Sequence, residues 1–233
     1  KQEVVDGSQA LRMSVGGKSF EVEPQAFFQV NPEVQELLES KLRRHLSEMD
    51  TVVDYYCGVG VHGVLAAQGA SKLIGVDASE AAIQSAKVNA ANNFDGEAVF
   101  RAQADTELEW VAKELVGERV GVIANPSRAG LSVPALRSII ACNPARIAYV
   151  SCSAETFFRD AERLQHAGFE AVELELFDMM PRTGHVEILG VFERLNKPAD
   201  SIEHDYWPVE DRHFSEGVSG ILGTDGKARW VGI

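Results

Sequence analysis

Three glycines follow a hydrophobic run in the segment VVDYYCGVGVHG, residues 52–63, and form the pattern G-x-G-x-x-G. Glycines in such a turn let the backbone approach a bound cofactor closely. Asp77 follows at the distance expected of an acid that binds both ribose hydroxyls. These residues predict a site for a cofactor that contains adenosine. Asp54 would face the pyrophosphate of a dinucleotide, and a positively charged sulfonium tolerates that carboxylate better, so the pattern favours a sulfonium cofactor over NAD.

Two other residues have side chains suited to covalent chemistry. Cys152 ends the strand-like segment AYVSC, and a helix is expected directly after it. The N-terminus of a helix favours negative charge, as a thiolate nucleophile requires. Glu187 begins an otherwise apolar segment and is a candidate general base at the rim of a cleft. Cys57 and Cys142 are interpreted as small buried hydrophobes.

Two polar residues are further candidates for contacts with a substrate. Asn125 follows the apolar segment RVGVIA and begins the sequence NPSRAG. Its amide is either aimed at a planar substrate above the edge of a sheet or part of a plain turn. His185 lies in the loop DMMPRTGHV, where it is either a substrate contact or a residue that anchors the loop.

The elements that position these residues alternate between strand and helix patterns from Thr51 to Arg194. The candidate strands are TVVDYY, KLIGVD, AVFRAQ, RVGVIAN, RIAYVSC, EAVELELF and EILGVFER. The last two are joined by a loop too short for a helical crossover, so they should pair antiparallel. This pattern predicts an α/β fold with a doubly wound, mostly parallel seven-stranded sheet and an antiparallel last strand. That is the class I S-adenosylmethionine-dependent methyltransferase fold.

Helix and hairpin signals precede the alternating region. The segment LRMSVGGKSFEVE alternates on both sides of Gly16 and Gly17 and predicts a hairpin. Asn31 and Pro32 are a good N-cap and first helical residue. The helix that follows has an apolar stripe. Its members are Val34, Leu37, Leu38, Leu42 and Leu46.

Composition limits the partners and the compartment. The 233 residues are 45% hydrophobic, and no uninterrupted apolar stretch reaches the ~20 residues of a membrane helix. The formal net charge of −13 opposes binding to a phosphate backbone. Three scattered cysteines without a C-x-x-C pair predict no metal site. An odd cysteine count without a secretory signal predicts a reducing, cytoplasmic setting.

Five segments, FFQVNP, DYYCGVG, NPSRAG, YVSCS and GHVEI, resemble in their order and spacing the RNA 5-methyluridine (uracil-5-) methyltransferase family. The resemblance covers roughly residues 20–194. It implies S-adenosyl-L-methionine as methyl donor, a uridine in ribosomal or transfer RNA as substrate, Cys152 as nucleophile and Glu187 as base. The expected cofactor contacts are Gln29, Tyr56, Gly58, Asp77 and Asn125, and the expected substrate contacts are Phe27, Asn125 and His185.

The chemistry of uracil agrees with this assignment. Ring carbon 5 is a poor nucleophile until a thiolate adds to carbon 6 and creates an enolate. Carbon 5 can then take the methyl group, and a base must remove its proton before the thiolate leaves. The reaction therefore needs one cysteine and one base on opposite sides of a flipped-out base.

The sequence departs from the family pattern at three places. Asn125 stands where Asp is frequent, and an amide can donate as well as accept, so we expect weaker discrimination of uracil from cytosine. Ser153 and Ala154 replace a commoner Asn-Pro after the cysteine. Val61 and His62 stand where polar and aromatic residues are frequent.

The resemblance also implies a domain organisation. Larger members carry an RNA-binding β-barrel and a middle domain ahead of this region, sometimes with an iron–sulfur cluster. We expect residues 1–26 to end such an upstream domain, residues 27–195 to form the catalytic domain, and residues 196–233 to be a C-terminal tail that wraps a surface or pairs with another segment. RNA affinity would then come from upstream domains, and the protein is expected to be a monomer.

Three alternatives remain open on the sequence. A class I methyltransferase acting on a small molecule or protein suits the acidic charge but leaves the cysteine and glutamate without a purpose. An NAD-dependent dehydrogenase conflicts with Asp54 and with the antiparallel final strand. A non-catalytic, cofactor-binding scaffold for RNA maturation requires the tail to cover the cleft.

Overall fold

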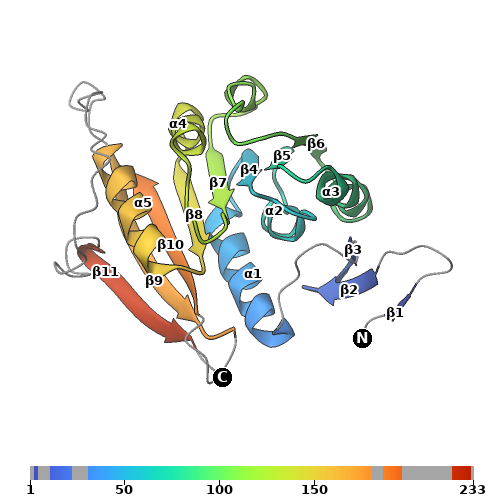
Figure 1. Ribbon diagram of the computed structural model, residues 1–233, viewed down its shortest axis with the longest axis horizontal. Helices are drawn as coiled ribbons and strands as arrows, with labels where there is room; N and C mark the ends of the chain where they lie inside the picture. The colour runs from blue at the N-terminus through green and yellow to red at the C-terminus, as the bar shows by residue number, and fades with distance from the viewer. Residues whose placement is uncertain (1–2, 5–10, 23–30, 180–185, 196–221, 232–233) are drawn as a thin grey trace.

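The computed structural model describes residues 3–4, 11–22, 31–179, 186–195 and 222–231 (Figure 1). Phe27, Gln29 and His185, three of the expected site residues, lie outside these ranges. A small antiparallel sheet consists of β1 (Glu3–Val4), β2 (Leu11–Val15) and β3 (Lys18–Val22). The large sheet consists of β4 (Thr51–Tyr55), β5 (Lys72–Asp77), β6 (Glu97–Ala102), β7 (Val120–Ala124), β8 (Arg146–Ser151), β9 (Phe169–Phe177), β10 (Glu187–Arg194) and β11 (Leu222–Val231). The helices are α1 (Pro32–Leu46), α2 (Val61–Ala66), α3 (Glu80–Asn93), α4 (Val133–Ala141) and α5 (Ala154–His166), with a 3-10 turn η1 (Val111–Lys113).

The large sheet has the strand order β11-β9-β10-β8-β7-β4-β5-β6. Strands β6, β5, β4, β7 and β8 pair parallel, and β10 lies between β8 and β9 and is antiparallel to both. The doubly wound, mostly parallel sheet with an antiparallel last strand of the alternating region is therefore confirmed. The described sheet has an eighth strand because residues 222–231 of the tail pair parallel with β9.

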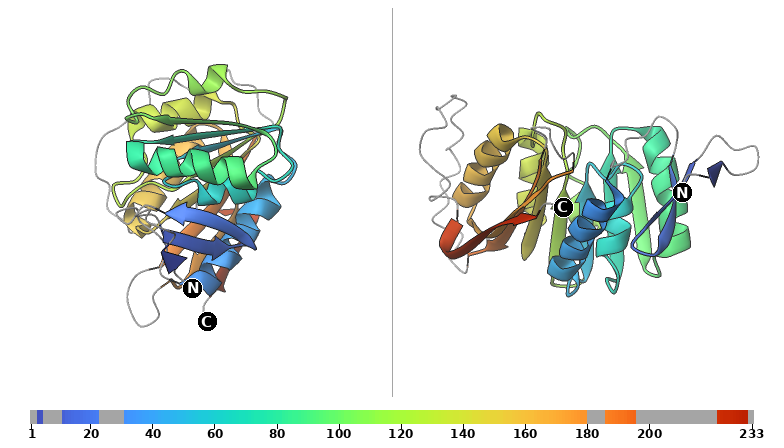
Figure 2. Two further views of the ribbon diagram at one scale, coloured as in Figure 1. Left: turned by 90° about the vertical axis from the view of Figure 1, so that its right-hand side faces the viewer. Right: turned by 90° about the horizontal axis from the view of Figure 1, so that it is seen from below.

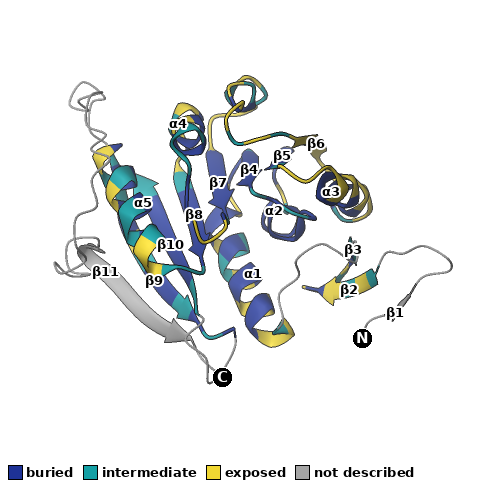
Figure 3. Cartoon of the chain, in the orientation of Figure 1, coloured by how far each residue is buried: buried dark blue, intermediate teal, exposed yellow. Residues whose placement is uncertain are grey.

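The two faces of the sheet carry two hydrophobic clusters, because successive strand residues point to opposite sides. Val52 packs with the helices α1, α2 and α3, and its neighbour Val53 packs with α4, α5 and η1. Figure 2 shows the helices on the two sides of the sheet, and Figure 3 shows the central strands as the most deeply buried part of the molecule. The layers hold the carboxyl ends of the parallel strands together at one edge of the sheet, the carboxyl edge.

Helix α1 begins as its sequence predicts. The Asn31 side chain accepts a hydrogen bond from the Val34 backbone N–H at 3.3 Å, and Pro32 is the first helical residue. The buried apolar stripe holds Val34, Leu38, Leu42 and Leu46, whereas Leu37 is 39% exposed. The prediction that Leu37 belongs to the buried stripe is wrong. Successive residues of a helix are rotated by about 100°, so Leu37 points away from the direction of its buried neighbour Leu38.

The hairpin of β2 and β3 turns at Gly16 and Gly17, whose φ angles are +58° and +75°. A buried side chain of α3, Asn89, helps to hold it in place. Asn89 Oδ1 accepts from the Glu21 backbone N–H at 2.7 Å, and its Nδ2 donates to the Glu21 and Val59 carbonyl oxygens at 2.9 Å each. A single amide thus ties the hairpin to the glycine turn.

Removal of residues 198–233 is expected to leave the rest of the chain folded. Strand β11 lies at the edge of the sheet, and the described hydrophobic clusters are built from residues before it. Circular dichroism and thermal unfolding of the shortened chain should show a cooperative transition. An insoluble product, or one that unfolds without a transition, would show that the tail belongs to the core.

Within the described ranges, no helix combines the length and apolar character needed to cross a membrane.

Candidate active site

The expected site residues that the structure describes lie at the carboxyl edge of the parallel strands, where ligands bind in open α/β sheets. Tyr56 follows β4, Asp77 ends β5, Asn125 follows β7 and Cys152 follows β8. Glu187 begins β10, whose opposite direction brings its first residue to the same edge. The sheet therefore assembles side chains that lie far apart in the sequence.

Cys152 and Glu187 lie at the adjacent ends of two paired strands. Strands β8 and β10 pair antiparallel, with Ser151 opposite Ile188. Cys152 and Glu187 are the next residues beyond this pair, one on each strand. Cys152 is half-buried, and α5 begins two residues later at Ala154. A partly accessible thiol and a carboxyl group thus share one edge of the sheet.

The other two cysteines have a different environment. Cys57 and Cys142 are 5% and 2% exposed, and burial raises the pKa of both thiols. The Cys142 sulfur lies 3.4 Å from the Tyr55 hydroxyl, on the face of the sheet covered by α4. The expectation that both are small buried hydrophobes is confirmed.

The glycine turn between β4 and α2 has a left-handed backbone. The φ angles are +60° at Tyr56, +53° at Gly58 and +85° at Gly60. A β-carbon built on Gly58 would have no atom within 4 Å, so the protein leaves open space beside this glycine. Asp77 Oδ2 accepts from the Gly58 backbone N–H at 2.9 Å, and its Oδ1 accepts from Ser79 N–H at 2.8 Å. The Asp77 carboxylate is thus held in a fixed position next to the turn.

Asp54 supports the glycine turn from inside the fold. It is fully buried, and its Oδ2 accepts from the Gly63 backbone N–H at 2.9 Å. A β-carbon on Gly63 would lie 2.8 Å from the same oxygen, so the third glycine is needed for this close approach. Burial raises the pKa of Asp54 to about 7, although the nearby His62 acts in the opposite direction.

Tyr56 is half-buried beside the turn, and its hydroxyl donates to Asp105 Oδ2 at 3.3 Å. Burial raises the pKa of Tyr56 to about 12, so the hydroxyl stays protonated at neutral pH. The ring therefore offers a flat, uncharged surface next to Gly58.

The loop that carries Asn125 is anchored on α5. Asp160, fully buried, accepts from the Leu131 backbone N–H at 2.7 Å and from the Tyr149 hydroxyl at 2.9 Å. Thr156 Oγ1 donates to the Arg128 carbonyl oxygen at 3.1 Å. These contacts hold the loop that follows Asn125, and sequence patterns did not indicate them.

A buried polar chain reaches Asn125 from α1 and was also missed by sequence reasoning. Glu39 Oε1 lies 2.8 Å from His62 Nδ1, and His62 Nε2 lies 3.1 Å from Asn125 Nδ2. Gln35 Nε2 donates to the same Glu39 oxygen. Glu39 is 1% exposed and His62 is 8% exposed. The sequence did contain one sign of this chain, because Gln35 and Glu39 are polar residues four positions apart on the otherwise apolar side of α1.

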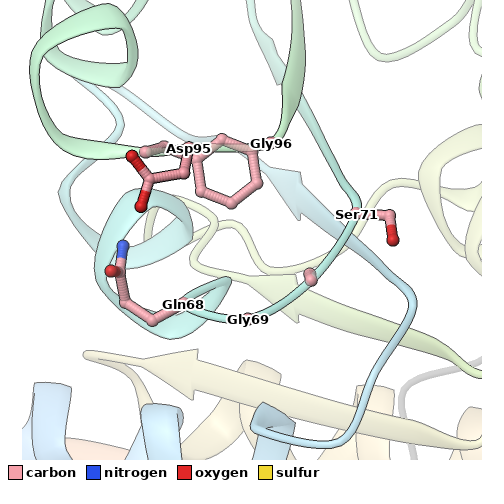
Figure 4. Close-up of a pocket in the computed structure, with 7 residues that line it drawn as sticks. Gln68, Gly69, Ser71, Asp95 and Gly96 are labelled. Carbon is pink, nitrogen blue, oxygen red and sulfur yellow. The ribbon is translucent and has the colours of Figure 1, made fainter.

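A separate pocket lies at the amino ends of the parallel strands, opposite the carboxyl edge. Its volume is about 320 Å³, and it is lined by residues 68–71, before β5, and residues 94–96, before β6 (Figure 4). These segments precede their strands, so the pocket is remote from the carboxyl edge. Among the described side chains, no group of three His, Cys, Asp or Glu residues is placed to hold a metal ion.

Comparison with known proteins identifies relatives of this chain. A structure with a TM-score of 0.68 and 30% identity is the Pyrococcus abyssi tRNA (uracil-54, C5)-methyltransferase in complex with S-adenosyl-L-homocysteine; the match covers 80% of this chain and 45% of that one. The M. jannaschii TYW2 structure, with AdoMet, has a TM-score of 0.53 and 14% identity over 83% of this chain and 90% of its own. These likenesses confirm the class I methyltransferase fold.

Sequence relatives agree with the structural ones. An uncharacterized RNA methyltransferase of Caldanaerobacter subterraneus subsp. tengcongensis is 35% identical over 198 residues, which are 84% of this chain and 44% of the relative. The chain thus spans less than half the length of this relative. Residues 2–195 match the sequence model of the family described as tRNA (Uracil-5-)-methyltransferase. The chain therefore belongs to the tRNA (uracil-5-)-methyltransferase family.

Proposed function

We propose that this chain is the catalytic part of an enzyme that methylates carbon 5 of a uridine in ribosomal or transfer RNA through a covalent cysteine adduct. One observation carries the proposal: Cys152 follows β8 and Glu187 begins β10 at the same carboxyl edge of the sheet, each one residue beyond the paired residues Ser151 and Ile188. Methylation of an oxygen or nitrogen atom needs no cysteine nucleophile. The pair therefore favours RNA over the small-molecule, protein and scaffold alternatives.

Each of the two residues has one task. The Cys152 thiolate forms a bond to carbon 6 of uracil, and the electron pair of the 5,6 double bond becomes an enolate. Carbon 5 then acts as a nucleophile toward the methyl group of the sulfonium donor, whose carbon–sulfur bond would break to release the neutral thioether S-adenosyl-L-homocysteine. Glu187 takes the proton from carbon 5, the double bond re-forms, and the thiolate leaves carbon 6. The cysteine is regenerated, and the carboxyl group has gained one proton.

The cofactor of this reaction is S-adenosyl-L-methionine, which supplies an electrophilic methyl group when bound. The residues at the glycine turn fit it. The open side of Gly58 admits a ligand next to the backbone, and the half-exposed Asp77 carboxylate is held where it can accept from ribose hydroxyls. Tyr56 offers its ring, and Asn125 its amide. The solved complex of the Pyrococcus abyssi relative with S-adenosyl-L-homocysteine supports this choice.

Asp77→Ala is expected to weaken binding of S-adenosyl-L-homocysteine by about 1–3 kcal/mol, the range for hydrogen bonds to a charged group. Isothermal titration calorimetry measures the change directly, apart from any loss of stability caused by the Asp77 contacts to Gly58 and Ser79. Asp95→Ala, an exposed acid at the opposite edge, is the matched control and should bind normally. NAD should not bind, and NAD binding of equal strength would contradict the cofactor assignment.

The isolated chain is expected to bind RNA weakly. Its formal net charge of −13 repels phosphates, and the chain spans less than half the length of its relatives. Adding upstream domains of the kind that the family resemblance implies should tighten binding, and this gain should weaken as the salt concentration rises. Filter binding at two salt concentrations tests this, and tight binding by the isolated chain would reveal a basic surface on it.

The function itself is tested by methyl transfer. The full-length protein is incubated with labelled cofactor and total RNA from cells in which its gene is deleted. Nucleosides are then separated by mass spectrometry. Label in 5-methyluridine is the expected result and also locates the target RNA. Label in another nucleoside, or in protein alone, would overturn the proposal.

A further inference from the structure

The C-terminal tail returns to the large sheet as strand β11. It pairs parallel with β9, and its residues 227–231 run in continuous register with residues 173–177. Figure 1 shows β11 alongside β9, at the side of the sheet away from β6. The match to the family sequence model ends at residue 195, so membership of the family assigns no role to this strand.

The direction of β11 brings its last residues to the carboxyl edge. Val231 pairs with Phe177, and Phe177 also pairs with Glu187 at the start of β10. One row across the sheet therefore joins the end of the tail strand to the candidate base. The neighbouring row consists of Trp230, Leu176, Ile188 and Ser151.

The end of β11 is close enough to the catalytic pair to meet the same RNA. Neighbouring strands lie about 4.8 Å apart, so the backbone of Trp230 is roughly 10 Å from that of Ile188, the residue after Glu187. Three stacked bases span about the same length, at about 3.4 Å each. When the target base lies between Cys152 and Glu187, nucleotides next to it are within reach of the end of β11.

Charges at paired positions favour this register of the tail strand. Lys227 pairs with Glu173, and Arg229 pairs with Glu175, a buried residue of β9. Opposite charges at paired positions stabilise a strand pairing. The two basic residues thus explain why β11 ends level with the start of β10, with Trp230 as its last residue but one.

We propose that Trp230, at the end of β11, stacks on an unpaired base of the RNA close to the target uridine, so that the tail strand extends the substrate-binding edge. The proposal rests on the proposed function, since it assumes that RNA binds at this edge. Aromatic side chains are the usual platforms for unpaired bases. Residues 226–233, GKARWVGI, contain no acidic residue, so this part of the acidic chain does not repel phosphates.

The first test is steady-state methyl transfer by the full-length protein. Trp230→Ala should raise the KM for RNA about 5- to 150-fold, the effect of one stacked base, and leave kcat nearly unchanged, since the contact is remote from the reacting atoms. Trp230→Phe should keep most of the affinity. Leu222→Ala, at the opposite end of the same strand, is the matched control and should behave as wild type.

Binding of S-adenosyl-L-homocysteine should be equal in all these variants, because β11 is an edge strand outside the described hydrophobic clusters. An unchanged KM in Trp230→Ala would overturn the inference. Equal losses in Trp230→Ala and Leu222→Ala would also overturn it, because they would show that β11 acts only through the fold. Absence of 5-methyluridine with the wild-type protein would instead refute the proposed function.

The second test locates the stacked base. RNA substrates carry an abasic nucleotide at one of the positions that flank the target uridine. At one position, loss of the base should raise the KM of the wild-type protein but have no further effect in Trp230→Ala, because the two changes remove the same contact. Independent effects of the two changes at every position would contradict the inference, even where Trp230→Ala alone weakens binding.

Discussion

Cys152→Ala is expected to abolish both methyl transfer and the covalent enzyme–RNA species. Without the thiolate, no bond forms to carbon 6. Carbon 5 then stays a poor nucleophile and does not attack the methyl group of the donor. The substitution removes one sulfur atom from a half-buried position at a strand end, so the fold should survive. Denaturing electrophoresis with RNA that contains 5-fluorouridine gives the readout, because fluorine cannot leave as a proton and traps the wild-type adduct.

The other two cysteines are the internal controls for this experiment. Cys57→Ala and Cys142→Ala should keep both turnover and the trapped species, since both thiols are buried and their pKa values are raised. A shifted band that persists in Cys152→Ala would move the nucleophile to another residue.

Glu187→Gln is expected to block a later step of the reaction. On the gel, the amount of covalent adduct should rise, whereas Cys152→Ala abolishes it. The thiolate still adds to uracil and the methyl group still transfers, but no base removes the proton from carbon 5. The thiolate then cannot be expelled, so the adduct accumulates with ordinary uridine while turnover falls about 10²- to 10⁴-fold, the usual contribution of a general base. The measurement is a band shift with unfluorinated RNA, together with the rate of product release.

A glutamate at the far end of the same strand provides the matched control. Glu193 pairs with Arg146 at the amino end of β8, away from the carboxyl edge. Glu193→Gln should therefore turn over normally and accumulate no adduct. Full turnover in Glu187→Gln would remove this residue from the role of base.

The fold of the alternating region was predictable because its signals are local. Buried strands such as Val120–Ala124 are continuous apolar runs, and the loop after Phe177 is too short for a helical crossover, so β10 must pair antiparallel. That the tail could pair with another segment was expected, but the position of strand β11 and its partner could not be predicted. Its sequence LGTDGKARWV has two glycines and no clear alternation, so its pairing depends on the free edge that β9 offers in three dimensions.

The residues of the site also include some whose places were predictable from the sequence and some whose contacts were not. The places of Cys152, Asp77 and Asn125 were predictable because each lies at or just after the end of a parallel strand, and these ends meet at one edge of the sheet; their roles stay proposals. The contact of Glu39 with His62 was not predictable, because they lie 23 residues apart on two helices and meet only through the packing of α1 against α2. Gln29, Phe27 and His185 stay predictions.

The large sheet ends on one side at β6, a strand with exposed residues at four of its six positions. Glu97 pairs with Lys72 at 3.0 Å, Arg101 pairs with Glu114 at 3.0 Å, and the Arg101 guanidinium lies 3.9 Å from the centre of the Trp110 ring. Unpaired backbone groups on an edge strand are templates for aggregation, and charged side chains along the edge oppose it. Neutralising Glu97 and Arg101 together would therefore expose the protein to strand-by-strand association during storage and refolding, with the catalytic edge of the sheet left intact.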